Sequence, residues 1–270
     1  FFVVMHACQS IGLWRVSLLA LALLAAPARA HDFWIEAAPF HPAPAERVAL
    51  RLFVGQDFAG EPIPYLPPLF ERFVRRGPDG EHAIRGIAGD DPAAQFTPAA
   101  AGLTVIGLQT RPQEVNFDNA AEFENYLRTE GLERHLLASS RRAPDKPIRE
   151  TYYRCAKALI VVKQSANPRH DYALGLPLEL LSESAPAAGQ PLRLLLLHHG
   201  KPLEGALVVL SRKAKPTDKL KARTDATGRV SFTLPARGVW LATSVHMLPA
   251  PFYAKEDWRS AWASLSFEVR

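Results

Sequence analysis

Two of the nine histidines in the chain stand where an imidazole could bind a metal ion. The first is His31, which follows Ala28-Arg29-Ala30, a small-residue signal that predicts cleavage after Ala30. A histidine at a new N-terminus offers its α-amine and its ring Nδ1 to one ion, and such nitrogen ligands suit nickel, cobalt, copper and zinc. The alternative is a first residue without a role, because signal peptidase tolerates many residues at that position.

His246 is the second candidate, and it is the expected partner of His31. Side chains alternate along a predicted strand at 239–246, so that Trp240, Ala242, Ser244 and His246 share one face. The other face is aliphatic, and we expect it to be the core. His246 would then lie near the strand end, before a turn at 247–249 that leaves room for a ligand. The alternative is a hydrogen-bonded histidine at a domain seam.

The remaining candidates carry weaker signals. His198 and His199 are adjacent, so strand alternation would direct their rings to opposite faces, and we expect a solvated pair before a turn. Carboxylates near the chain ends could complete the coordination or hold a ring N–H, and the sequence does not choose among Asp32, Glu36 and Asp257. Four histidines in loop or helix-surface contexts are expected to be surface residues: His41, His82, His135 and His170.

No pattern of a known catalytic class is present in the sequence. It contains no Gly-x-Ser-x-Gly elbow, no glycine-rich phosphate loop and no Cys-His arrangement, so we expect a binding protein and not an enzyme. Cys155 is expected to be a small buried residue. Large aromatic residues are expected to close the sandwich ends and domain interfaces, namely Trp34, Trp240, Trp258 and Trp262 with Phe33 and Phe252.

Residues 1–30 are predicted to be a cleaved export signal, with Arg15, an apolar run from Val16 to Ala26 and the cleavage site in order. The run is shorter than the roughly 20 residues that span a bilayer, so we expect a periplasmic protein with no membrane span after cleavage. Without Arg15 and Arg29 the chain keeps 30 basic residues against 27 acidic ones. This near-neutral balance and the scattered basic residues indicate no nucleic-acid partner.

The segments that must position these residues are mostly short strands. Pro at 23 and Gly at 16 of 270 residues favour many turns. Period-two patterns predict strands at 46–55, 103–108 and 152–162, and Asn119 is expected to cap a helix over 120–128, followed by a short second helix at 132–138. The fold class is therefore mainly β, with two antiparallel β-sandwich domains and a short helical insertion in the first.

The expected domains are a β-rich domain at 31–181 with its helix near 120–137, a linker at 182–189 and an independently packed C-terminal sandwich at 190–270. The small, polar, turn-forming composition of 182–189 supports the linker. Further strands are expected near 192–197, 206–210, 230–234, 239–246 and 261–269.

Six segments, read in order, resemble an exported bacterial family called domain of unknown function 4198. They are His31-Asp-Phe-Trp-Ile-Glu36, Arg51-Leu-Phe-Val-Gly55, Arg154-Cys-Ala-Lys-Ala-Leu159, Leu174-Gly-Leu-Pro-Leu-Glu-Leu180, Gly238-Val-Trp-Leu241 with Val245-His-Met247, and Trp258-Arg-Ser-Ala-Trp-Ala-Ser-Leu265. Within the last third, Gly200-Lys-Pro-Leu-Glu-Gly205 and Thr224-Asp-Ala-Thr-Gly228 resemble a transthyretin-like or carboxypeptidase-regulatory-like sandwich. The family resemblance implies an accessory of nickel or cobalt uptake.

These observations together predict a periplasmic protein that binds a divalent transition metal ion and supports its uptake or handling, with a membrane metal transporter as a possible partner. Two alternatives remain open. One is a copper-dependent oxygenase in which His31 forms a histidine brace. The other is a structural or adhesive envelope protein in which the histidines are incidental.

Overall fold

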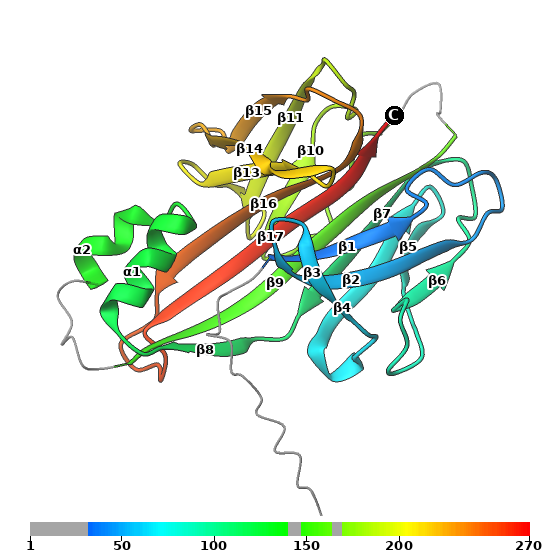
Figure 1. Cartoon of the computed structure of the whole chain (residues 1–270). Helices are drawn as coiled ribbons and strands as arrows, with labels where there is room; N and C mark the ends of the chain where they lie inside the picture. Colours follow the sequence, from blue (N-terminus) through cyan, green and yellow to red (C-terminus); the bar gives the residue numbers. More distant parts are fainter. Residues whose placement is uncertain (1–31, 140–146, 164–168) are drawn as a thin grey trace, which may run out of the picture.

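The computed structural model describes residues 32–139, 147–163 and 169–270, which form three β-sheets and a small helical segment (Figure 1). The N-terminal sheet contains β1 (Asp32–Ala38), β2 (Val48–Gln56), β3 (Ala59–Ile63) and β6 (Ala94–Phe96). The central sheet contains β4 (Phe70–Gly77), β5 (Gly80–Ala83), β7 (Gly102–Thr110), β8 (Gln113–Phe117), β9 (Ile148–Val162), β13 (Leu207–Arg212), β14 (Lys215–Arg223), β16 (Gly238–Pro249) and β17 (Trp258–Val269). The C-terminal sheet contains β10 (Leu178–Ser182), β11 (Pro191–His198), β12 (Lys201–Pro202) and β15 (Arg229–Thr233).

The two smaller sheets cover opposite faces of the central sheet. Along β9, Ala156, Ala158 and Ile160 pack in a core with the N-terminal sheet, while Cys155 and Leu159 pack in a core with the C-terminal sheet. Side chains alternate between faces along a strand, so the division of these residues places one sheet on each side. The mainly β, antiparallel architecture expected from the sequence is confirmed, with β17 and β9 as a parallel pair.

The helical segment follows β8 and lies against the same face as the N-terminal sheet. It consists of α1 (Ala120–Thr129), a 3-10 turn η2 (Glu133–His135) and α2 (Leu136–Ser139), and a further 3-10 turn, η1 (Pro67–Leu69), precedes β4. Asn119 caps α1 as predicted, because its side chain accepts a hydrogen bond from the Glu122 N–H at 2.9 Å. Phe123 and Leu127 pack on Val245 and Trp258 of the central sheet.

The structure differs from the expected division into two independently packed domains. Both β16 and β17, which were assigned to a separate sandwich at 190–270, lie inside the central sheet, and β17 pairs with β9 from Trp258↔Glu150 to Ser266↔Ala158. The predicted linker at 182–189 joins β10 to β11, two strands that pair directly. The physical reason is that β17 is buried on both faces, a pattern that suits an interior strand and not the wall of a small sandwich.

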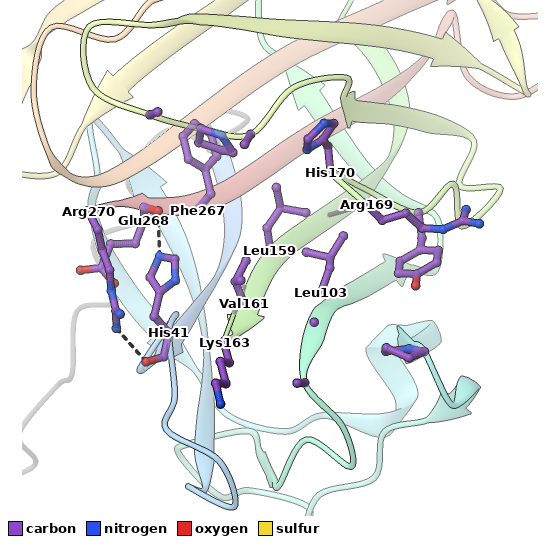
Figure 2. Close-up of a pocket in the computed structure, with 17 residues that line it drawn as sticks. His41, Leu103, Leu159, Val161, Lys163, Arg169, His170, Phe267, Glu268 and Arg270 are labelled. Carbon is purple, nitrogen blue, oxygen red and sulfur yellow. Dashed lines mark hydrogen bonds between the residues drawn. The ribbon is translucent and has the colours of Figure 1, made fainter. Parts of the chain in front are cut away.

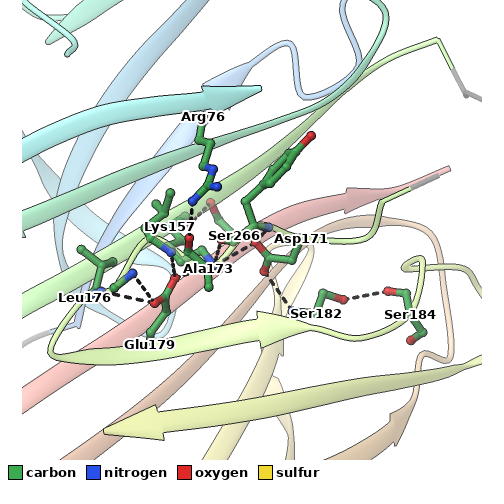
Figure 3. A network of polar contacts seen from close by, with 12 residues as sticks. Arg76, Lys157, Asp171, Ala173, Leu176, Glu179, Ser182, Ser184 and Ser266 are labelled. Atoms are coloured by element: carbon green, nitrogen blue, oxygen red, sulfur yellow. Dashed lines mark hydrogen bonds and ion pairs between the residues drawn. The ribbon is translucent and has the colours of Figure 1, made fainter. Parts of the chain in front are cut away.

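A buried ionic network joins the central sheet to the C-terminal sheet (Figure 3). The Lys157 ammonium of β9 donates to Asp171 Oδ1 at 2.8 Å, to Glu179 Oε1 at 3.1 Å and to the Tyr172 carbonyl at 3.1 Å. Glu179 also accepts from the N–H groups of the loop before β10, at Leu174, Gly175 and Leu176. The loop at 169–177 is therefore held firmly against β9.

Candidate functional site

The predicted metal ligand His246 lies on β16, on the face that the alternation pattern predicts. It shares that face with Trp240, Ala242 and Ser244, but this face is buried as well, since His246 is only 7% exposed. The expectation of a single aliphatic core face is wrong because β16 is an interior strand with a sheet on each side. The strand also continues through the predicted turn, pairing as far as Pro249↔Trp258.

Three imidazole rings converge beside β16, and we call His198, His199 and His246 the imidazole cluster. The ring centroid of His198 lies 4.4 Å from that of His246 and 4.5 Å from that of His199. The expectation that His198 and His199 point to opposite faces is wrong. His199 has a φ of 48°, and this left-handed conformation ends the alternation of β11 and turns its ring back toward His198.

Two residues of the helical segment complete the surroundings of His246, although the sequence pattern places them on a helix surface. Arg134 Nη2 donates a hydrogen bond to His246 Nδ1 at 3.0 Å. Because a guanidinium only donates, the neutral His246 ring carries its proton on Nε2 in this arrangement. His135 donates from Nε2 to the Met247 carbonyl at 3.0 Å, and its ring packs edge-on against Trp258 at 5.0 Å.

Two rings of the imidazole cluster, those of His246 and His198, are held toward the neutral state. Burial lowers the pKa of His246 to about 4, assisted by His198, Arg134 and the other neighbouring imidazoles. Burial and His199 also lower the pKa of His198. The cluster lines a cavity of about 380 Å³ together with Tyr153 and Arg259, and none of the residues that line it is a carboxylate. Neutral imidazole is the form that binds metal ions.

In their present orientations, the three rings of the imidazole cluster do not form a metal-binding geometry. Nowhere in the described ranges are three or more His, Cys, Asp or Glu side chains arranged so that they could hold a metal ion. The plane of the His198 ring is inclined by 60° to that of His246 and by 61° to that of His199, an edge-to-face arrangement. The ring nitrogens therefore do not point toward one common position. Arg134 also occupies Nδ1 of His246. Metal binding therefore requires these side chains to rotate.

His31 lies outside the described residues, so its pairing with His246 stays a prediction. The strand that follows it, β1, lies over the face of the central sheet opposite His246. Ser264 and Ser266 donate to the carbonyls of Phe33 and Ile35 in β1, whereas His246 pairs with Ala261, which points to the other face.

The three candidate carboxylates also lie away from the imidazole cluster. Asp32 lines a separate polar cavity with Glu130 and Lys219, Glu36 pairs with Lys213, and Asp257 accepts a hydrogen bond from the Arg149 N–H. None of them lines the cavity of the cluster.

Two other sequence predictions are confirmed. Cys155 is 1% exposed, and burial raises the pKa of its thiol to about 12, so it is a core residue. The tryptophans that the sequence assigned to interfaces are buried: Trp34, Trp240, Trp258 and Trp262. Phe252 differs, because it is fully exposed on the loop after β16. Among the described residues, no helix has both the length and the apolar character needed to cross a bilayer.

Comparisons with known proteins place the chain in a family without assigning it an activity. The structure is similar to the D0-D1 domain of intimin, with 10% sequence identity, 87% of this chain and 97% of that chain covered, and a TM-score of 0.20. It is also similar to a tetra-tandem repeat in the extending region of a large adhesion protein, with 9% identity, 89% and 50% covered, and a TM-score of 0.23. Scores this low carry no argument about function.

No curated protein matches the chain. The family model described as Domain of unknown function (DUF4198) matches residues 28–248, and the chain belongs to this family.

Proposed function

We propose that this chain is an exported, periplasmic protein that binds a divalent transition metal ion through the imidazole cluster and supports uptake or handling of nickel, cobalt or copper. The observation that carries the proposal is the meeting of three imidazoles in one cavity, with ring centroids 4.4 and 4.5 Å apart. Imidazole nitrogen suits all of these ions and zinc.

The electrostatics of the cavity support a ligand role over a structural one. A histidine that only stabilises the fold usually donates to a carboxylate or a carbonyl, as His135 does to Met247. His246 instead accepts from Arg134, and its ring lies against the imidazole of His198, with the ring centroids 4.4 Å apart. His198 is partly buried and His199 is exposed, so their rings can rotate toward a common point.

The Arg134 contact must give way in the bound state. A divalent ion beside His246 would repel the guanidinium, so we expect Arg134 to leave Nδ1 and turn toward solvent when metal binds. Breaking this hydrogen bond costs free energy, and the bonds between the metal ion and its ligands must more than offset that cost.

The proposal is tested by calorimetry with metal-free protein that begins at His31, titrated with Ni²⁺, Co²⁺, Cu²⁺ and Zn²⁺. We expect one ion per chain, and at least about tenfold weaker binding in His198→Ala and in His246→Ala. His82→Ala is the matched control, because His82 is exposed and contacts Asp79 on β5's hairpin. Equal affinity in both cluster variants and the control, or no binding by the wild type, would refute the proposal.

The contribution of His31 is separated by a form extended with one N-terminal glycine. The extension removes the α-amine from the chelate while leaving the imidazole cluster intact. Weaker binding in the extended form would assign His31 a part in the site, and unchanged binding would leave the imidazole cluster as the whole site.

A further inference from the structure

A second and larger cavity, of about 600 Å³, lies at the opposite end of the same face of the central sheet (Figure 2). The histidine cavity reaches β9 at Tyr153, whereas this one reaches it at Leu159 and Val161. The two sites are therefore separated along one strand.

The floor of the cavity is apolar and comes from three adjacent strands. Leu103 of β7, Leu159 and Val161 of β9, and Phe267 of β17 form it, and Figure 2 shows these side chains directed into the same space. Pro186 and Ala187 of the loop between β10 and β11 also line the cavity. An apolar floor of this kind binds a hydrocarbon or aromatic body.

The rim of the cavity is cationic. Lys163, beside Val161, and Arg169, on the other side of the cavity, both line it (Figure 2), and within the described part of the chain neither forms an ion pair with a carboxylate. Arg169 lies over the Tyr172 ring at 5.2 Å from its centroid. Across the cavity, Arg270 Nη2 donates to the His41 carbonyl at 2.8 Å. Glu268 is the one acidic side chain in the lining.

The wall that carries Arg169 and Tyr172 is fixed in place before any ligand arrives. It belongs to the loop that Lys157 holds through Asp171 and the Tyr172 carbonyl, and Arg76 Nη1 donates to the Ala173 carbonyl at 2.9 Å. A preformed wall reduces the ordering cost of binding, so the cavity has the rigidity of a ligand site.

We propose that this cavity binds a small amphipathic anion, an aliphatic carboxylate whose chain lies on the apolar floor and whose headgroup meets Lys163 and Arg169. The unpaired cations give the headgroup its charge complement, and the volume lies within the roughly 300 to 1,000 Å³ of small-molecule sites. This site is independent of the metal-binding proposal.

The test uses decanoate as the probe, titrated calorimetrically into the protein in buffer with EDTA so that no metal contributes. Decanol and decyltrimethylammonium carry the same chain with a neutral and a cationic headgroup. We expect decanoate to bind with one site per chain, and the other two to bind at least about tenfold more weakly. Equal binding of decanoate and decanol would overturn the proposal, as would no binding of decanoate.

Variants then locate the site. Lys163→Met and Arg169→Met should each weaken decanoate binding about fivefold, the weight of one partly exposed ion pair, while Lys201→Met, an exposed cation on β12, should not. Ala187→Trp should fill the cavity and abolish binding without altering either cation, with the folded state checked by circular dichroism. Decanoate binding that survives in Ala187→Trp would place the ligand elsewhere and reject the assignment.

Discussion

Lys157→Met should lower the free energy of unfolding by about 3 to 5 kcal/mol, because it leaves buried carboxylates without their counter-ion. The Lys157 side chain is 1% exposed, and those of Asp171 and Glu179 are 3% and 2% exposed. Methionine keeps nearly the volume of the lysine stem, so the change removes the ammonium without opening a large cavity. The expected fall in melting temperature is on the order of 10 °C.

The matched control is Lys213→Met. Lys213 also forms an ion pair, with Glu36 at 2.5 Å, but its side chain is 47% exposed. Exposed pairs contribute at most about 1 kcal/mol, so this variant should change stability little. Both variants are unfolded in urea and followed by tryptophan fluorescence at pH 8 and at pH 5.

The cost of Lys157→Met should shrink at the lower pH. Burial raises the pKa of Asp171, and Lys157 opposes that rise. Without the lysine, a buried carboxylate can lose its uncompensated charge by taking up a proton. This protonation occurs more readily at pH 5 than at pH 8. A loss of unfolding free energy equal to that of Lys213→Met, or a loss that does not change with pH, would refute the inference that these buried ion pairs stabilise the fold.

Three further predictions concern other sites. Burial raises the pKa of the fully buried Glu150 from 4.5 to about 7, so between these pH values the folded state holds a proton that the unfolded state has released. The free energy of unfolding should therefore fall by on the order of 3 kcal/mol as the pH rises from about 4.5 to about 7. Glu150→Gln should remove that slope in urea unfolding measured from pH 4 to pH 9. Asn119→Ala should cost about 1 kcal/mol in the same assay, because Glu122 N–H loses its cap. In metal-free protein, His246 should stay neutral by NMR down to about pH 4, and stability should fall as pH drops from about 6.5, where the unfolded imidazole takes up a proton that the folded one refuses.

The strands were most predictable where one face is apolar and the other polar. Period two predicts β2, and Val48, Leu50 and Leu52 are fully buried in it while Arg51 is exposed. The period-two pattern does not predict β14, because its lysine-rich sequence belongs to an exposed edge strand. It also cannot show which strands pair, so it gives no sign that β17 joins β9 across more than a hundred residues.

The imidazole cluster was predictable only through His246. Strand alternation separates His198 from His199, and it fails because the turn begins at His199 itself, in a left-handed conformation that histidine adopts more readily than most residues. A histidine immediately before Gly200 and Lys201-Pro202 is a local signal for that turn. The contacts of Arg134 and His135 with β16 have no such signal, since they depend on how the helical segment packs.

The placement of both cavities follows from a mismatch in strand length. In the central sheet β9 has 15 residues and β17 has 12, whereas in the facing C-terminal sheet β10 has 5 and β11 has 8. A short sheet packed on long strands covers the middle of their face and leaves each end to loops. At one end the last residue of β11 and the turn after it bring His198 and His199 to His246, and at the other the loop after β9 places Arg169 in the lining of the cavity to which Leu159 contributes. Because Lys157 lies between these ends and holds the loop that forms the second cavity, its loss should weaken decanoate binding while leaving the imidazole cluster in contact.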